Sequence, residues 1–309
     1  MSRRRRNKID GVNGILLLDK PGGITSTQAL NRAKRALGAS RGGHTGSLDP
    51  LATGVLPLTF GEATKLSAYL LNAEKRYIVE ARLGVATDTG DADGVVRAEM
   101  PVPALDEAGV EKILAGFRGP IEQIPPMYSA LKHKGERLYE IARRGETVER
   151  EPRPVTIHEL QLVSLGAERM TLAMRCSKGT YVRTLVEDIG EALGSCAHVT
   201  ALRRTAVAGY TEESDRLVPL AELEAAAVPR DLLLAPESAL RERPALNLTR
   251  ELAFFLRRGR PVLVPQAPTE GFVRLYDEAG RFFGVGEMIE DGRIAPRRLL
   301  RVPPAAAEA

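Results

Sequence analysis

The most informative stretch of this sequence reads Gly42-Gly-His-Thr-Gly-Ser-Leu-Asp-Pro-Leu-Ala-Thr-Gly-Val-Leu-Pro57. Asp49 is the only acidic residue between Asp19 and Glu62, and it precedes Pro50, which biases its backbone to an extended conformation. A carboxylate among apolar neighbours must be paired or its pKa rises, and enzymes use such groups as nucleophiles and general acids. The alternative is an ordinary turn, because Asp is common in Gly-rich turns. The residues alone leave both interpretations open.

The composition is that of an ordinary globular protein. The 309 residues are 43% hydrophobic and 27% charged, which predicts about two domains. No apolar run approaches the roughly 20 residues of a membrane helix, and no apolar stretch follows the N-terminal arginines as in a secretory signal. Cys176 and Cys196 are too few for a disulfide scaffold and lack metal-ligand spacing. We therefore expect a cytoplasmic protein with no membrane contact and no cysteine-based metal site.

The net charge of +4 is unevenly distributed. Residues 1–50 carry a net +7, residues 51–240 carry −6, and residues 241–309 carry +3, with arginine as the only cation in the last window. Two basic ends around an acidic middle indicate a polyanion held by particular surfaces. A run of arginines is also a common solubility or localisation feature, so charge alone makes nucleic acid only one candidate partner.

Strand and helix patterns alternate irregularly along the chain. Helix signals include a cap at Thr25 or Ser26 and a stop at Gly38. Without regular strand–helix–strand spacing, the order predicts an α+β fold with a largely antiparallel sheet. We expect strands at residues 14–19, 76–83, 155–165, 170–175 and 199–207, and helices at 26–37, 62–72, 106–115, 137–143 and 184–193.

The chain divides into a tail and two domains on these patterns. We expect residues 1–10 to be a basic, disordered tail and residues 11–240 to form the main domain. Within it, the Pro- and charge-rich stretch 123–153 is predicted to be an insertion. The remaining residues, 245–309, alternate short strands with Gly turns and predict a small β-rich module.

Four separated segments resemble one family. They are Asp19-Lys-Pro-Gly-Gly23, Gly43-His-Thr-Gly-Ser-Leu-Asp-Pro50, Lys75-Arg-Tyr77 and Cys176-Ser-Lys-Gly-Thr-Tyr-Val-Arg-Thr184. Their order and spacing resemble the TruB family of bacterial tRNA pseudouridine synthases. The resemblance implies a pseudouridine-synthase-type mixed sheet with flanking helices, and isomerisation of uridine 55 in the T-loop of tRNA. It also implies an enzyme that needs no metal or redox cofactor, and we expect a monomer.

The resemblance assigns three catalytic residues. Asp49 matches the family's catalytic aspartate, and attack on either the ribose C1′ or the uracil C6 remains open. Arg183 matches the arginine that pairs with this aspartate and keeps it ionised. Tyr77 matches the tyrosine that stacks on the target base. From the residues alone, a tyrosine such as Tyr77 on an amphipathic strand is more often part of the core. The alternative for Arg183 is an exposed arginine at a helix start, although a buried anionic partner explains it better.

Five further residues are candidates for substrate binding. The target base must leave its folded loop, so a pocket with an apolar wall is expected. In the resemblance, His44 fills or stacks within the remodelled T-loop and Leu202 lies beside the active site. Tyr181 belongs to the arginine motif, and Lys20 and Lys178 stand beside Gly turns as phosphate or structural contacts.

Two regions resemble the RNA-binding parts of the family. Residues 123–153 resemble the flexible segment that clamps the T-loop, and residues 245–309 resemble a PUA domain, which implies contact near the acceptor stem of tRNA. Basic pairs such as Arg143-Arg144 and Arg203-Arg204 are candidate phosphate contacts, although each is equally a solvated face. 

Two other functions remain alternatives. The first is a non-catalytic tRNA-binding or folding factor. The second is a tRNA uridine methyltransferase, which is disfavoured because the sequence has no GxGxxG or P-loop pattern.

Overall fold

The computed structural model describes residues 11–301, so the tail expected at residues 1–10 lies outside the described residues. The helices are α1 (Ser26–Leu37), α2 (Ser67–Leu71), α3 (Glu107–Ala115), α4 (Leu138–Arg143), α5 (Val182–Ala192), α6 (Leu220–Ala225) and α7 (Arg250–Arg257), with 3-10 turns η1 (Gly61–Leu66), η2 (Pro229–Leu232) and η3 (Pro236–Leu240). The strands are β1 (Gly14–Lys20), β2 (Gly42–His44), β3 (Thr53–Phe60), β4 (Lys75–Leu83), β5 (Val85–Thr87), β6 (Val96–Glu99), β7 (Gly119–Gln123), β8 (Lys132–His133), β9 (Glu136–Arg137), β10 (Arg153–Leu165), β11 (Arg169–Cys176), β12 (Ala197–Val207), β13 (Tyr210–Thr211), β14 (Val218–Pro219), β15 (Ala245–Asn247), β16 (Phe272–Tyr276), β17 (Phe282–Met288) and β18 (Ile294–Leu299).

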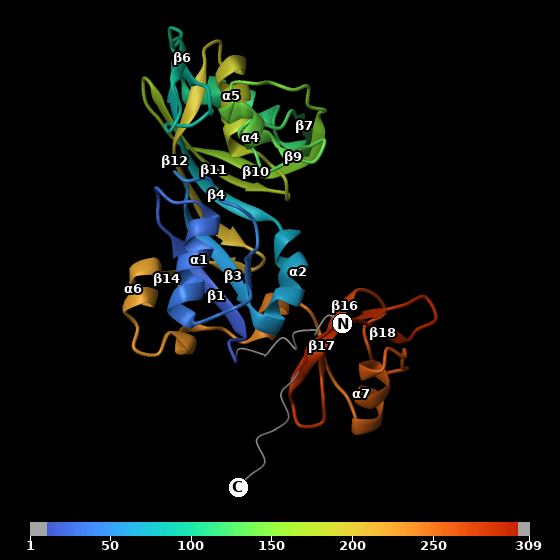
Figure 1. Cartoon of the computed structure of the whole chain (residues 1–309). Coiled ribbons are helices and arrows are strands. Elements are labelled where there is room, and N and C mark those ends of the chain that lie inside the picture. Colours follow the sequence, from blue (N-terminus) through green and yellow to red (C-terminus); the bar gives the residue numbers. More distant parts are fainter. Residues whose placement is uncertain (1–10, 302–309) are drawn as a thin grey trace.

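One large sheet organises most of the chain. Its ten strands have the order β14-β1-β3-β12-β4-β11-β10-β7, with β2 paired to β3 and β13 to β12. Only the pairs β1–β14 and β3–β12 are parallel. Figure 1 shows the central strands running from the lower part, beside α1 and α2, to the upper part, beside α4 and α5. The expected α+β fold with a largely antiparallel sheet is confirmed.

Local signals in the sequence account for the first helix. Thr25 accepts a hydrogen bond from the Gln28 backbone N–H while the Gln28 side chain accepts one from the Thr25 backbone, which is a complete capping box. Gly38 ends the helix in the left-handed conformation, with φ of 64°. The helix expected at residues 62–72 begins instead as a 3-10 turn and becomes α-helical only at Ser67.

The central strand β4 buries every second residue, as a strand with one core face should. Lys75 and Tyr77 are therefore on the buried face together with three aliphatic residues. Tyr77 stands opposite Met174 of β11 on one side and Arg204 of β12 on the other. The period-2 pattern thus places the tyrosine inside the sheet's core.

A glycine permits the parallel contact between β3 and β12. Gly54 lies beside Arg204 and has a φ of +98°. A Cβ built on Gly54 would lie 2.2 Å from the Arg204 carbonyl oxygen, so no other residue fits without moving a strand. This close approach joins β12 to the strand that directly follows the Asp49 loop.

The C-terminal residues form a second sheet. It has the order β15-β16-β17-β18, and α7 packs on its separate apolar core around Leu256, Val273 and Phe283. Two bonds join it to η1: Lys65 Nζ donates to the Leu299 carbonyl at 2.8 Å, and the Arg301 N–H donates to Glu62 Oε2 at 2.7 Å. In Figure 1 this sheet stands below and beside α2.

Within residues 11–301, no helix has both the length and the apolar character needed to cross a membrane.

Candidate active site

The loop that carries Asp49 is anchored on both sides. Directly before Asp49, the Leu48 N–H donates to Ser26 Oγ at 2.8 Å, and that hydroxyl donates to the Leu48 carbonyl at 3.1 Å. Leu48 itself is buried in the main core. The Ala52 N–H donates to the Asp49 carbonyl at 3.1 Å on the other side. The first turn of α1 therefore fixes the backbone from which the carboxylate projects.

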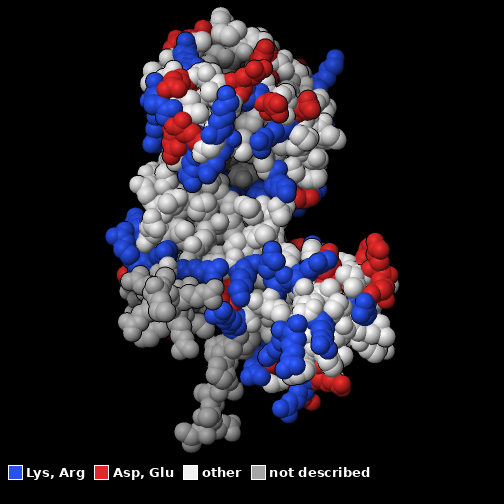
Figure 2. All heavy atoms as spheres, turned by 45° about the vertical axis from the view of Figure 1, so that its right-hand side comes forward, with Lys and Arg blue, Asp and Glu red and all other residues white. Residues whose placement is uncertain are grey.

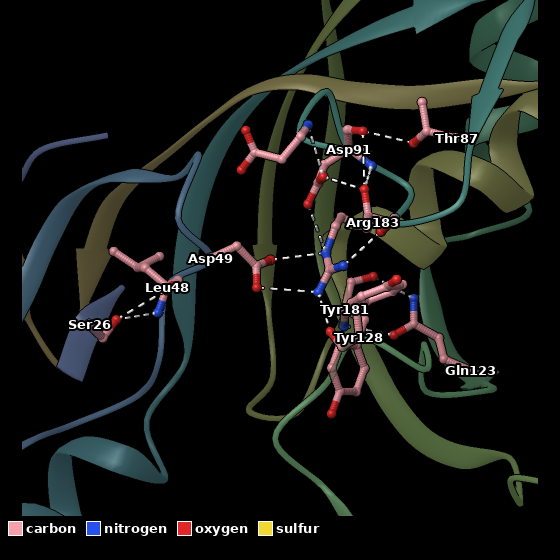
Figure 3. A network of polar contacts seen from close by, with 11 residues as sticks. Ser26, Leu48, Asp49, Thr87, Asp91, Gln123, Tyr128, Tyr181 and Arg183 are labelled. Atoms are coloured by element: carbon pink, nitrogen blue, oxygen red, sulfur yellow. Dashed lines mark hydrogen bonds and ion pairs between the residues drawn. The ribbon is translucent and has the colours of Figure 1, made fainter. Parts of the chain in front are cut away.

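Asp49 and Arg183 form a two-point ion pair (Figure 3). Arg183 Nε lies 3.0 Å from Asp49 Oδ2, and Arg183 Nη2 donates to Asp49 Oδ1 at 3.2 Å. The remaining donors reach two carbonyls, those of Thr89 at 2.7 Å and Tyr128 at 2.9 Å. The guanidinium, whose side chain is 6% exposed, is thus held in one orientation.

A second carboxylate shares this arginine. Asp91 Oδ2 lies 3.7 Å from Arg183 Nε, and its other oxygen accepts hydrogen bonds from the Thr89 hydroxyl and the Asp93 N–H. Asp91 was not among the site residues predicted from the sequence. The sequence pattern that could have pointed to Asp91 is the run Thr87-Asp-Thr-Gly-Asp-Ala-Asp-Gly94, which places several aspartates among glycines after a buried strand.

This arrangement determines the charge state of Asp49. Burial raises the pKa of the Asp49 carboxyl above its ordinary value; Arg183 lowers it, Asp91 raises it and Lys20 lowers it. The net direction is upward, so the expectation that Arg183 holds Asp49 ionised is only part of the balance. The side chain keeps 38% of its surface exposed, which leaves the carboxylate accessible from solvent.

Tyr77 and His44 stand near a common buried cation, Arg204. Burial raises the pKa of the Tyr77 hydroxyl, and the Arg204 charge opposes this effect. Burial and Arg204 both lower the pKa of His44, which favours the neutral imidazole. In the described structure His44 Nδ1 is buried without a hydrogen-bond partner. Both rings are therefore uncharged aromatic surfaces close to the Asp49 loop.

Comparisons with known proteins identify the family. A model of "TruB family pseudouridylate synthase (N terminal domain)" matches residues 34–182, "tRNA pseudouridylate synthase B C-terminal domain" matches 183–242, and "Pseudouridine synthase II TruB, C-terminal" matches 244–300. This chain belongs to the TruB family.

Full-length relatives agree with this membership. The tRNA pseudouridine synthase B of Nitrosococcus oceani is 54% identical over 305 residues, covering 97% of this chain and 98% of the relative. That of Coxiella burnetii is 53% identical over 296 residues, covering 94% and 95%.

Solved structures show the same fold at low identity. A Cbf5-Nop10-Gar1 complex matches with a TM-score of 0.71 and 23% identity, over 94% of this chain and 84% of the other. An H/ACA RNP bound to a substrate RNA matches with a TM-score of 0.70 and 20% identity, over 94% and 85%. The pseudouridine-synthase-type fold is confirmed.

Lys20 lies within the TruB core rather than at a surface that a phosphate can reach. Its side chain is fully buried, and Nζ donates to the carbonyls of Pro21, Pro50 and Ala52 at 2.9, 3.2 and 2.7 Å. Burial lowers the pKa of Lys20 to about 8, against the opposing charge of Asp49. Of the two roles expected for Lys20, a phosphate or a structural contact, these bonds favour the structural one, because the ammonium ties the residues after Asp49 to the end of β1.

The other substrate-binding candidates occupy three different settings. Leu202 is buried in the main core on β12, opposite Val79. Tyr181 precedes α5, and its backbone N–H and carbonyl bond to the Gln123 side chain at 2.9 and 3.2 Å. Lys178 is exposed, and Nζ donates to Asn72 Oδ1 at 2.9 Å. Of the three, Lys178 has the most accessible charge.

The pair Arg203-Arg204 also requires a correction. Arg204 is 1% exposed and donates to the carbonyls of Val55 and Gly46, at 2.7 and 3.3 Å. Arg203 forms ion pairs with Asp19 and Glu212. Neither is a free phosphate contact, since strand alternation turns one residue into the core and the other toward acidic neighbours.

The segment 123–153 reaches the active site directly. Its Tyr128 carbonyl accepts from Arg183, and its Ser129 carbonyl accepts from the Tyr139 N–H at 3.1 Å. Arg137 and Arg143 lie over the Tyr139 ring, 5.8 and 5.5 Å from its centroid. The segment therefore presents a cationic, aromatic surface that is joined to the arginine beside Asp49.

Proposed function

We propose that this protein converts uridine 55 in the T-loop of tRNA to pseudouridine, with Asp49 as the nucleophile. The observation that carries the proposal is an accessible carboxylate held by a two-point bond to a buried arginine, in a chain of the TruB family. The relatives named tRNA pseudouridine synthase B support tRNA as the substrate.

The chemistry is an isomerisation that needs no external reactant. Asp49 attacks either the ribose C1′ or the uracil C6, and the bond between C1′ and N1 breaks. The uracil turns and C5 bonds to C1′. In the C1′ route the bond between C1′ and Asp49 breaks as this new bond forms, and in the C6 route the bond between C6 and Asp49 breaks afterwards. C5 then loses its proton and N1 gains one, so that atoms and charges balance.

The chain's own residues divide the remaining tasks. Arg183 orients Asp49 and offsets the cost of placing its charge among apolar side chains. Tyr77 and His44 offer neutral rings to a base that has left its stack. The segment 123–153 closes over the T-loop, and residues 245–309 act as a PUA-like domain toward the acceptor stem. We further propose that the enzyme works as a cytoplasmic monomer.

The experiment compares Asp49→Asn with Asp106→Asn. Asp106 caps α3 far along the chain, and Asn caps helices equally well, so this control keeps the fold and changes the same atoms. With tRNA tritiated at C5 of its uridines, Asp49→Asn should release no tritium above background while Asp106→Asn matches the wild type. Both should bind tRNA normally.

Three outcomes would contradict the proposal. Full tritium release by Asp49→Asn removes this carboxylate from the mechanism. Release from a tRNA in which uridine 55 is replaced by cytidine moves the site elsewhere. A wild type that binds and refolds tRNA without releasing tritium favours the non-catalytic alternative.

A further inference from the structure

A pocket of about 410 Å³ lies between helix α2 and the C-terminal sheet. It is separate from the cluster of Asp49, Arg183 and Asp91, none of which lines it. Three parts of the chain form its walls: the end of α2, the connection between the two sheets, and strands β16 and β18. The lining residues that matter here are Tyr69, Asn72, Arg241, Arg243, Phe272 and Arg298.

One wall of the pocket is aromatic. The rings of Tyr69 and Phe272 meet edge to face, with centroids 5.2 Å apart and planes at 81°. Burial raises the pKa of the Tyr69 hydroxyl while Arg298 lowers it, which indicates that this guanidinium is a near neighbour. The hydroxyl makes no hydrogen bond to any described residue and is a neutral donor available to a ligand.

Two arginines of the pocket have no anionic partner among the residues that the structure describes. Arg241 is engaged, since it pairs with Asp215 at 2.9 Å and stacks 4.0 Å above the Tyr210 ring. Within residues 11–301, Arg243 and Arg298 form no ion pair, although both are exposed. Arg298 donates only to the carbonyl of its neighbour Arg297, at 3.0 Å.

The charges around these arginines favour an anion. Arg297, the residue before Arg298 on β18, is already neutralised by its ion pair with Glu287. Glu242 is the acidic residue of the lining, and its carboxylate is packed against Gly209. Two unpaired guanidiniums in a hollow form a ready receptor for a phosphate, which they bind through charge-assisted hydrogen bonds.

The pocket is connected to the active site along the protein surface. Asn72 accepts from exposed Lys178, which lies five residues before Arg183. Along the chain, Asn72 is also five residues before Tyr77, a span of at most about 18 Å. Figure 2 shows Lys and Arg side chains gathered along the waist of the molecule and over the C-terminal sheet. A single polyanion can therefore reach both places.

We propose that this pocket is a second RNA subsite, which binds a phosphate and its nucleotide from the same RNA whose uridine enters the Asp49 site. Arg243 and Arg298 hold the phosphate, and the ring and hydroxyl of Tyr69 contact the nucleotide. The inference rests on the proposed function, because it takes the substrate to be tRNA.

The test uses the double variant Arg243→Gln/Arg298→Gln with Arg293→Gln as a matched control. Arg293 is an exposed arginine of the same sheet that lies outside the pocket. Dissociation constants are measured from about 50 to 200 mM salt for full-length tRNA and for the isolated T-arm hairpin. We expect the double variant to bind both RNAs at least about tenfold more weakly, since hydrogen bonds to charged groups are the stronger ones.

The salt dependence identifies the contact as a phosphate. The slope of log affinity against log salt should become shallower by about one to two in the double variant, because each lost phosphate contact removes roughly 0.7 to 0.9. Arg243→Lys/Arg298→Lys keeps the charges and should restore most of the slope. The single-turnover rate at saturating enzyme should equal that of the wild type and of Arg293→Gln.

Either of two results would overturn the inference: unchanged affinity and slope in the double variant, or an equal loss of affinity and slope in Arg293→Gln. Both results can be told apart from a failure of the proposed function. If the proposed function fails, the wild-type protein itself releases no tritium.

Discussion

Two aspartates of this molecule meet arginines in opposite ways. Asp277 in the C-terminal sheet receives two guanidiniums, from Arg257 and Arg281, together with the backbone N–H groups of Ala279 and Arg281. Asp49 receives one guanidinium, which it shares with Asp91. Asp277 therefore has two guanidiniums to itself, whereas Asp49 must share the one guanidinium that it contacts.

Burial and the donors together set the direction in which each pKa moves. Burial raises the pKa of Asp277, but the Arg281 backbone and side chain and the Arg257 charge outweigh it and hold the pKa below its ordinary value. For Asp49 burial prevails, and Asp91 adds to it. The ionised form of Asp277 therefore stabilises the fold, whereas the ionised form of Asp49 opposes it, as expected of the reactive group that we propose.

The sharpest way to break the comparison is Arg183→Lys. An ammonium is a point charge and cannot reproduce the two-point bond to Asp49, so the carboxylate loses its orientation. Misplacement of a reacting group by about 1 Å costs on the order of 100-fold in rate, and we expect a loss of at least that size in single-turnover tritium release. The dissociation constant for tRNA should change little. Near-normal turnover would mean that the pair does not position Asp49.

Asp91→Asn should lower the single-turnover rate by only about tenfold. It alters the charge near Asp49 but leaves the direct bonds between Asp49 and Arg183 in place. Removal of the like charge lowers the pKa of Asp49. Since the nucleophile must be deprotonated, the acidic limb of the pH–rate profile should move to lower pH. The profile is measured under single-turnover conditions with Asp93→Asn as the control. An unmoved limb would show that Asp91 does not act on Asp49 through its charge.

The smallest effects concern stability and have opposite signs. Loss of hydrogen bonds to a charged, buried group predicts that Asp277→Asn lowers the free energy of unfolding by about 2 kcal/mol near pH 7. Because the folded pKa is depressed, this contribution is present above the unfolded pKa near 3.9 and is lost as the pH falls through the folded value.

Asp49→Asn removes a carboxylate whose ionised form opposes folding. Its melting temperature should equal or exceed that of the wild type, and thermal denaturation against pH checks both variants.

The sequence predicted the elements better than their interior contacts. Caps such as Thr25 and Gly38 are local, so the helix between them was predictable. The role of Lys20 was not, because its partners are carbonyl oxygens, which every residue carries and no sequence pattern marks. Arg203 and Arg204 are adjacent in the sequence, but only Arg204 is on the buried face of β12. Their adjacency therefore gave no sign that their surroundings differ.

The candidate site was predicted only in part. The contact between Asp49 and Arg183 was implied by the family motifs, and the structure contains it. Asp91 was missed because it is 42 residues further along the chain and its contact depends on the turn after β5. Long-range partners of this kind become visible only when the sheet brings the segments together.

Gly54 carries a last consequence for how this enzyme tolerates change. The space between its Cα and the Arg204 carbonyl has no room for even a methyl group, and the reactive loop ends two residues earlier. A single added carbon would push the two parallel strands apart and tilt the loop that carries Asp49. A residue with no side chain is thus a critical support of the proposed site, and random mutagenesis scored for activity should find it almost as intolerant as Asp49 itself.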